Sequence, residues 1–473
     1  MKELRRQIKG ILALFLVGFT CLVGYLSYNV YVNGSRWFSS PYNTRLYDQR
    51  ASVIAGDILD RNDTTLATTQ EDGKRVYPGD EAQRRATCHA VGDPYGYSAG
   101  GAESTQAAYL LAMNSSILDR TYQAVTGEKV RGNDVILTID AALSEKIAGY
   151  MGDYRGAVAL VNWRTGEVYA MVSQPGFDPM DMSAFKSEDT LSDDMKSALV
   201  NRATQGRYTP GSVMKIVVAA TALERDLALT NQTFTCDGKT DIGGGKTISC
   251  YKGEVHGTVD MERGFTKSCN GLFATLGMEL GKNNLFAGAE KFGFNQTFFF
   301  NQVPVYTANF PELDTDWDCA YAAIGQSTVT ITPMHMALIA ASIPNGGTAL
   351  QPQLLAATQD SMGVRTSRLK TQKWKTLMKS STAAALEEMM VATVEEGTGR
   401  NAQVEGYRVG GKTGTAEVSD DKGVSPHSWF VGFIDDEEHP LAIAVVLEHA
   451  GAGSQAAAPL AGKAFRAALE AGY

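Results

Sequence analysis

Apolar and polar residues divide the chain into three parts. Residues 10–32 are uncharged and almost entirely apolar, and about 20 such residues suffice to cross a bilayer as a helix. Residues 36–152 are more polar and contain clusters of turn residues, whereas residues 153–473 contain the long apolar runs of a buried core. We therefore expect a membrane helix, an elongated polar module and a large compact domain.

The third part predicts an α/β (α+β) fold in which helices flank an antiparallel sheet. A hairpin is expected where residues 156–161 and 167–172 flank a turn at Arg164-Thr-Gly166. Helices are expected at about 211–225, 259–282, 333–345 and 380–396, and from about Ala456 to the end. Strands are expected at 406–410, 415–418, 428–434 and 441–447. The sheet is therefore predicted to take its strands from both ends of this part.

The N-terminal residues set the expected orientation of the membrane helix. Residues 1–9 hold four basic side chains against the single acid Glu3, and such positive flanks stay in the cytoplasm. The apolar run is long for a cleaved signal peptide, and no small-x-small cleavage site follows it. We predict a retained, single-pass anchor in the cell membrane, with everything after about residue 35 outside the cytoplasm.

Charge and composition narrow the possible functions. A net charge of −9 argues against a nucleic-acid groove. The six histidines lack helical metal-ligand spacing and there is no CxxC, so neither a metal site nor a cofactor is expected. Cys236 and Cys250 bracket a Gly-rich loop, and the sequence leaves open a disulfide or two free thiols.

The octapeptide Tyr208-Thr-Pro-Gly-Ser-Val-Met-Lys215 is a candidate nucleophile site. Pro210-Gly211 signals a turn, which places Ser212 in the first turn of the predicted helix and Lys215 one turn further on the same face. A serine hydroxyl is a weak nucleophile until a base takes its proton, and a lysine amine in a dry cleft can be that base. We predict that Ser212 forms a covalent acyl-enzyme.

Spacing alone does not select this serine. Serine precedes lysine by three positions at Ser183/Lys186, Ser212/Lys215, Ser249/Lys252, Ser367/Lys370 and Ser419/Lys422. Two downstream motifs favour the second pair: Ser268-Cys-Asn270 and Lys412-Thr-Gly-Thr415, which contains the only Lys-Thr-Gly of the chain. Penicillin-binding proteins and class A β-lactamases share these three motifs.

On these motifs the chain resembles a monofunctional class B penicillin-binding protein, a D,D-transpeptidase of bacterial peptidoglycan synthesis. The likeness extends to the anchor and to a pedestal pattern that runs from Asn43 and Arg45 through Gly56-Asp-Ile-Leu-Asp-Arg61 to Leu66-Ala67. Further family-like stretches are Thr165–Met171, Ile324–Ser327, Glu396–Gly399 and Trp429–Gly432. The resemblance implies a cytoplasmic tail (1–9), a transmembrane anchor (10–32), a pedestal (36–152) and a transpeptidase domain (153–473) of the serine β-lactamase-like fold.

The resemblance also implies a role for each motif residue. Ser212 would be the nucleophile and Lys215 its base, while Ser268 would relay a proton and Asn270 would orient Lys215 and the substrate amide. Lys412 would stay cationic and attract the substrate carboxylate, to which Thr413 and Thr415 would offer hydroxyls beside Gly414. The backbone N–H groups of Ser212 and Thr415 would form the oxyanion hole. Cys269 stands at a variable position of the family, and we expect it to be a packing residue.

Three other functions compete with this one. Residues 406–413 match the P-loop pattern, but strand and turn residues follow Thr413 where a P-loop needs a helix. A class A β-lactamase would need a Glu-x-x-Leu-Asn loop after Asn270, which is not present in the sequence. A membrane-anchored β-lactam sensor would usually need a signalling module, and only nine residues precede the anchor.

The expected partners follow from the family. They are peptidoglycan stem peptides ending in D-Ala-D-Ala, β-lactams, the membrane and a separate glycosyltransferase, because no transglycosylase domain is recognisable in the sequence. No nucleic-acid partner is expected.

Overall fold

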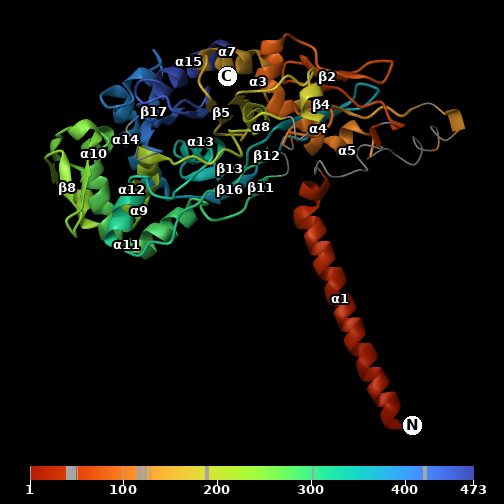
Figure 1. Cartoon of the computed structure of the whole chain (residues 1–473), viewed down its shortest axis with the longest axis horizontal. Helices are drawn as coiled ribbons and strands as arrows, with labels where there is room; N and C mark the ends of the chain where they lie inside the picture. The colour runs from red at the N-terminus through yellow and green to blue at the C-terminus, as the bar shows by residue number, and fades with distance from the viewer. Residues whose placement is uncertain are drawn as a thin grey trace.

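A computed structural model describes most of the chain. The described residues are 2–38, 49–50, 52–98, 100–113, 121, 125–127, 129–186, 191–300, 303–418 and 423–473. Asn43 and Arg45 of the pedestal pattern, and the pair Ser419/Lys422, lie outside them. Helix α1 (Lys2–Phe38) extends away from the rest of the molecule (Figure 1). Its segment Glu3–Asn29 is long and apolar enough to cross a membrane, with a mean hydropathy of 2.1.

The central element is a five-stranded antiparallel sheet in the order β17-β18-β19-β5-β6. Its strands are β5 (Gly156–Asn162), β6 (Val168–Gln174), β17 (Val409–Ala416), β18 (His427–Ile434) and β19 (Leu441–Leu447). The hairpin β5–β6 begins this part of the chain, and its strand β5 pairs with β19, the last strand. This pairing confirms that both ends of this part supply strands to one sheet. Every residue of β5 and β19 is buried.

Helices cover both faces of this sheet. On one face α7 (Ala141–Met151) and α15 (Ala457–Glu470) pack against β6, β18 and β19. On the other face α13 (Pro333–Ser342) packs against β5, β18 and β19. Helix α9 (Lys215–Glu224) contacts α14 (Ser380–Glu395), and α14 contacts β17. A core thus lies on each side of the sheet.

Residues 409–416 form one strand, so the prediction of two strands separated at Lys412-Thr-Gly was wrong. Its glycines are required by close packing inside the strand. A Cβ atom on Gly411 would lie 2.2 Å from the ring of Phe430, and one on Gly414 would lie 2.9 Å from the Pro210 carbonyl oxygen. These residues therefore permit neighbouring groups to approach the backbone of β17 closely.

The single helix predicted over 259–282 is also wrong in detail. Helix α10 (Met261–Thr266) ends before Ser268, which has a φ of 58°, and α11 (Asn270–Lys291) begins two residues later. Cys269 caps the N-terminus of α11 by accepting the N–H of Leu272. The Ser-Cys-Asn motif therefore occupies a sharp break between two helices.

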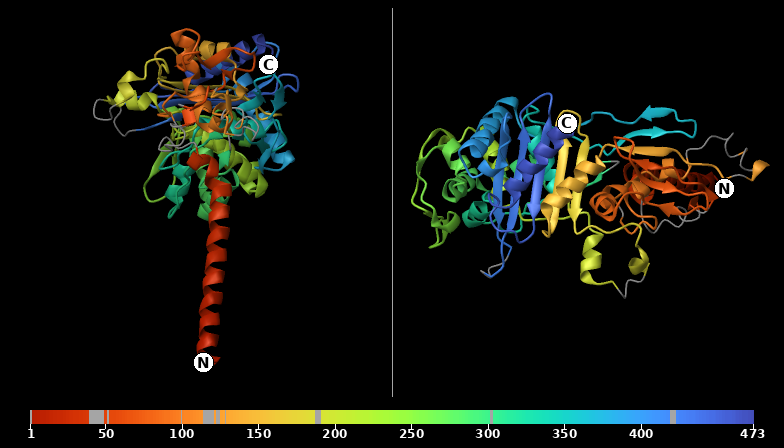
Figure 2. Two further views of the ribbon diagram at one scale, coloured as in Figure 1. Left: turned by 90° about the vertical axis from the view of Figure 1, so that its right-hand side faces the viewer. Right: turned by 90° about the horizontal axis from the view of Figure 1, so that it is seen from above.

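A second sheet lies beside the first, in the order β15-β14-β4-β1-β2-β3. Four strands come from the predicted pedestal: β1 (Ile58–Leu59), β2 (Thr65–Thr69), β3 (Arg75–Val76) and β4 (Asp134–Leu137). The other two, β14 (Leu355–Gln359) and β15 (Arg365–Ser367), come from the middle of the C-terminal part. Strand β14 pairs with β4, and β15 pairs with β14 (Figure 2). The pedestal sheet is therefore completed by residues far along the chain.

The two parts also meet through side chains. The Arg61 guanidinium lies 4.4 Å from the ring centroid of Tyr169 and 4.6 Å from that of Tyr473, and the two rings stack. The other described helices are α3 (Glu81–Val91), α4 (Ala102–Thr105), α5 (Ala107–Leu110), α8 (Asp193–Ala198) and α12 (Asp316–Ala323). Short two-stranded sheets pair β7 (Phe234–Cys236) with β10 (Gly257–Val259), β8 (Lys239–Asp241) with β9 (Thr247–Ser249), β11 (Phe299–Phe300) with β12 (Val303–Pro304), and β13 (Thr348–Leu350) with β16 (Lys373–Thr376).

Candidate active site

Ser212 lies on a tight turn at the edge of β17. The 3₁₀ turn η3 (Gly211–Met214) runs directly into α9, and it contacts β17. Gly211 has a φ of 56°, and its N–H donates to the Gly325 carbonyl at 2.9 Å. A side chain at Gly211 would be strained and would also meet the Thr415 carbonyl. The half-buried Ser212 is thus fixed between the sheet and the loop that contains Gly325.

Of the four Ser/Lys pairs in the described part of the chain, this one alone pairs a half-buried serine with a fully buried lysine. Ser249, Lys252, Ser367 and Lys370 are exposed, as is Ser183. Lys215, by contrast, has no exposed surface. The structure thus separates the pair that the motifs favour from the pairs on solvated surfaces.

The Lys215 ammonium is bound by the opposite wall of the site. Its Nζ donates to Asn270 Oδ1 at 2.7 Å, to the Ser268 carbonyl at 2.8 Å and to Ser268 Oγ at 3.2 Å. Burial lowers the pKa of Lys215 from 10.5 to about 8. An amine with such a pKa can lose its proton near neutral pH, as a general base must.

Lys412 reaches the same serine from β17. Its Nζ donates to Ser268 Oγ at 2.9 Å and to the Thr413 carbonyl at 3.2 Å. Burial, and then the proximity of Lys215, holds the pKa of Lys412 well below its usual range. This direction runs against the prediction that Lys412 stays cationic in the unliganded site. A bound substrate carboxylate would raise that pKa again, because an opposite charge favours the ammonium form.

The remaining motif residues line the strand beside these lysines. Thr413 Oγ1 lies 2.6 Å from Thr398 Oγ1, in the Glu396–Gly399 stretch. Thr415 Oγ1 accepts the N–H of Gly453 at 3.3 Å. Asn270 Nδ2 donates to the Ser249 carbonyl at 2.9 Å. The Ser212 hydroxyl makes no hydrogen bond to another described residue, so its Oγ is not held by a partner there.

A group of hydrogen-bonded side chains holds the octapeptide in place, and it was not predicted from the sequence. The Tyr208 hydroxyl donates to Glu448 Oε1 at 2.8 Å, and Arg202 Nε binds the same oxygen at 2.8 Å. Trp429 Nε1 donates to the Thr209 carbonyl at 3.0 Å. No motif links Arg202 and Tyr208 to Glu448, because Glu448 is about 240 residues away and is brought to them only by the folded chain.

The match to a family model settles the family. The model described as the penicillin-binding protein transpeptidase domain matches residues 156–469, about two thirds of the chain. The chain belongs to this family. The predicted family and fold class are thereby confirmed, and β17 continues as a strand after Thr413 where a P-loop would require a helix.

Curated relatives agree with the family. The chain is 29% identical to peptidoglycan D,D-transpeptidase PbpA of Mycolicibacterium smegmatis over 459 residues, which cover 92% of this chain and 93% of that protein. It is 32% identical to stage V sporulation protein D of Bacillus subtilis over 359 residues, covering 72% of this chain and 54% of that protein. PbpA is named a peptidoglycan D,D-transpeptidase, and the likeness to it confirms the activity predicted for this penicillin-binding protein.

Solved structures show the same fold. Penicillin-binding protein A of M. tuberculosis, solved as a ceftriaxone acyl-enzyme complex, matches with a TM-score of 0.80 and 26% identity, covering 89% of this chain and 99% of that one. A D,D-transpeptidase domain from Eggerthella lenta matches with a TM-score of 0.76 and 28% identity over 89% of this chain and 99% of that chain.

Proposed function

We propose that this chain is a peptidoglycan D,D-transpeptidase in which Ser212 carries the acyl-enzyme. One observation carries the assignment of residues: Lys215, one turn after Ser212, and Lys412 from β17 both donate to Ser268 Oγ. The three motifs, which are far apart in the sequence, thus meet in one hydrogen-bonded group. Such a group can move a proton away from a serine and towards a leaving amine.

Acylation begins with neutral Lys215 accepting the proton of Ser212 Oγ. The oxygen attacks the carbonyl carbon between the two terminal D-Ala residues, and the N–H groups of Ser212 and Thr415 stabilise the oxyanion. The C–N bond then breaks, and the leaving D-Ala amine takes the proton through Ser268. An amine of a neighbouring stem peptide attacks the ester, which forms the cross-link and returns a proton to Ser212.

The other residues bind the substrate. Lys412, with the hydroxyls of Thr413 and Thr415 beside Gly414, holds the terminal carboxylate. Asn270 Oδ1 accepts a hydrogen bond from Lys215 Nζ, and Asn270 would also hold the substrate amide. A β-lactam has a carboxylate and a strained amide in the same arrangement, so it acylates Ser212 and is released slowly.

Helix α1 supports a membrane-anchored placement of the enzyme. The basic residues in its first turns, ahead of the apolar run, predict a cytoplasmic N-terminus, a single membrane crossing and a catalytic domain outside the cytoplasm. There the enzyme needs new glycan strands, which a separate glycosyltransferase would supply. The limits 36–152 for the pedestal and 153–473 for the transpeptidase domain remain part of this proposal.

Intact mass spectrometry with penicillin tests the nucleophile. We expect the full-length protein in detergent to gain one covalent adduct, and Ser212→Ala to gain none, because the serines of the other described Ser/Lys pairs, Ser183, Ser249 and Ser367, are exposed. Ser367→Ala is the matched control, since Ser367 belongs to an exposed Ser/Lys pair. An adduct that persists in Ser212→Ala, or disappears in Ser367→Ala, would refute the assignment.

A further inference from the structure

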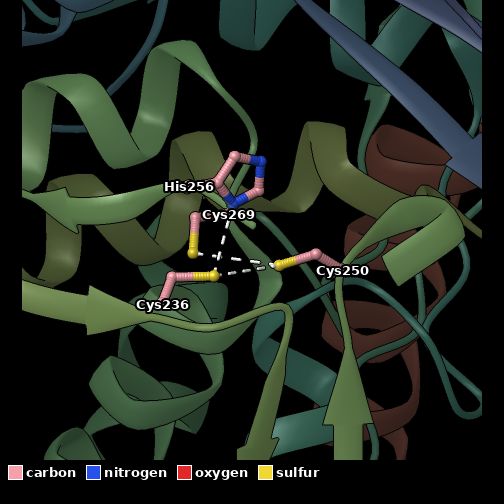
Figure 3. Close-up of side chains that lie close together, drawn as sticks. All are labelled: Cys236, Cys250, His256 and Cys269. Atoms are coloured by element: carbon pink, nitrogen blue, oxygen red, sulfur yellow. Dashed lines mark hydrogen bonds between the residues drawn. The ribbon is translucent and has the colours of Figure 1, made fainter. Parts of the chain in front are cut away.

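Four side chains that are dispersed in the sequence converge behind the Ser-Cys-Asn motif. Cys236 ends β7, Cys250 follows β9, His256 precedes β10, and Cys269 caps α11. Their ligand atoms, three Sγ and one imidazole nitrogen, all lie within 4.8 Å of one another (Figure 3). The three thiols are buried, and the His256 side chain is only 8% exposed.

The distances match a tetrahedral metal site. With Zn–S bonds of about 2.3 Å and Zn–N bonds of about 2.0 Å, tetrahedral ligands lie about 3.8 Å (S to S) and about 3.5 Å (S to N) apart. Cys236 Sγ lies 3.6 Å from Cys250 Sγ and 3.4 Å from His256 Nδ1, and Cys250 Sγ lies 3.9 Å from Cys269 Sγ. All of these cysteines are free thiols.

The histidine is oriented as a ligand would be. Its Nδ1 faces Cys236, whereas Nε2 is buried without a hydrogen-bond partner and points to the Glu254 carboxylate at 3.8 Å. Imidazoles that bind metal through one nitrogen commonly direct the other N–H to a carboxylate, which fixes the tautomer. Both nitrogens of the His256 imidazole therefore have the neighbours that are typical of a metal-binding histidine.

We propose that Cys236, Cys250, His256 and Cys269 bind one Zn²⁺ in a structural site. Three S–Zn bonds and one N–Zn bond form, and the three thiol protons pass to solvent. Thiolate and imidazole ligands in a tetrahedral set select zinc, and four protein ligands leave no open position for catalysis. No metal site was expected from the sequence, because these ligands lack the CxxC or helical spacing of common zinc motifs.

The site would position the catalytic wall. Cys269 stands between Ser268 and Asn270, the two residues that bind Lys215. A metal bond at Cys269 would tie this break between α10 and α11 to the ends of the two short sheets β7–β10 and β8–β9. The four ligands are positioning residues, and their effect on acylation rests on the proposed function, whereas metal binding itself does not.

The alternative to metal binding is a disulfide between two of these thiols, because disulfides form outside the cytoplasm. Cys236–Cys250 and Cys250–Cys269 are the neighbouring pairs. A disulfide would leave too few thiolates for the proposed ligand set, so the two states are mutually exclusive and can be distinguished chemically.

Metal analysis of the full-length protein, purified from membranes in detergent, tests the site. We expect about one zinc per chain in the wild type and in Cys319→Ser, which removes a buried thiol in α12. Cys236→Ser should lose most of the metal. Ser212→Ala should keep it while losing penicillin labelling, which separates failure of the zinc site from failure of the proposed function.

Cobalt substitution tests the ligands without a variant. Wild-type protein stripped with a chelator and loaded with Co²⁺ should show thiolate-to-cobalt charge-transfer bands, and Zn²⁺ should abolish them. Penicillin acylation should slow by at least about tenfold in stripped protein and recover with Zn²⁺, as expected when positioning contacts of a site are lost. Zinc well below one per chain, full zinc in Cys236→Ser, or a mapped disulfide among these cysteines would overturn the proposal.

Discussion

The two walls of the active site are held in different ways. One wall is β17, whose eight residues pair continuously with β18 from Val409 to Ala416. The other is the Ser268–Asn270 break between α10 and α11, which belongs to no sheet. Continuous strand pairing thus fixes Lys412 and Thr413, whereas Ser268 and Asn270 are held by local backbone hydrogen bonds at the helix ends and by side-chain contacts. The second wall therefore depends on individual groups: Lys215, the Ser249 carbonyl and the cysteine-histidine cluster.

The largest effect is expected at Lys215, which contacts the second wall through three hydrogen bonds. Lys215→Met keeps the length of the side chain but removes the base, and general-base catalysis contributes roughly 10²- to 10⁴-fold. We expect penicillin acylation, followed by stopped-flow or gel labelling, to slow by that factor. Lys252→Met, at an exposed pair, is the control and should acylate normally. Near wild-type acylation by Lys215→Met would exclude this lysine as the base.

A smaller loss is expected when the second wall alone is weakened. Asn270→Ala removes a 2.7 Å acceptor of Lys215 and the donor to Ser249. A hydrogen bond to a charged group contributes about 1.5–3 kcal/mol, which corresponds to roughly 10- to 100-fold in the acylation rate. Asn284→Ala, near the middle of the same helix, loses only a bond to the Leu280 carbonyl and should leave acylation unchanged. Equal rates in the two variants would contradict the importance of this wall.

The pH profile should report Lys215. Because burial lowers its pKa to about 8, the neutral form that accepts the serine proton is scarce below that pH and predominant above it. Acylation should therefore rise about tenfold per pH unit below pH 8 and level off above it. The measurement is the penicillin acylation rate from pH 6 to 10. A flat profile, or an inflection that survives in Lys215→Met, would assign the titration to another group.

The smallest expected effect is a loss of stability when the packing of the first wall, strand β17, is altered. Gly411→Ala places a Cβ 2.2 Å from the buried Phe430 ring, and such overpacking costs about 1–3 kcal/mol of stability. Gly149→Ala is the matched control: nothing lies within 4 Å of its Cβ, and it sits on the exposed face of helix α7. There alanine should stabilise by about 0.5–1 kcal/mol. Denaturation midpoints that move in the same direction would contradict this account.

Local sequence determined much of the architecture. The apolar run before residue 32, the β5–β6 hairpin, the terminal strands and the three motifs were each recognisable from nearby residues. Their order alone pointed to the family that the comparisons confirm. Such features are local because hydrophobic periodicity and turn chemistry act over a few residues.

Only the tertiary structure decided the rest. Glycines 410, 411 and 414 lie within the single strand β17 against Phe433, Phe430 and Pro210, where the sequence predicted two separate strands. Strands β14 and β15 complete the pedestal sheet, and Tyr208 meets Glu448, through contacts between distant segments. The same holds for Cys236, Cys250, His256 and Cys269. Their chemistry depends on distances of a few ångströms, and those distances are set by how hairpins and helices pack rather than by spacing along the chain.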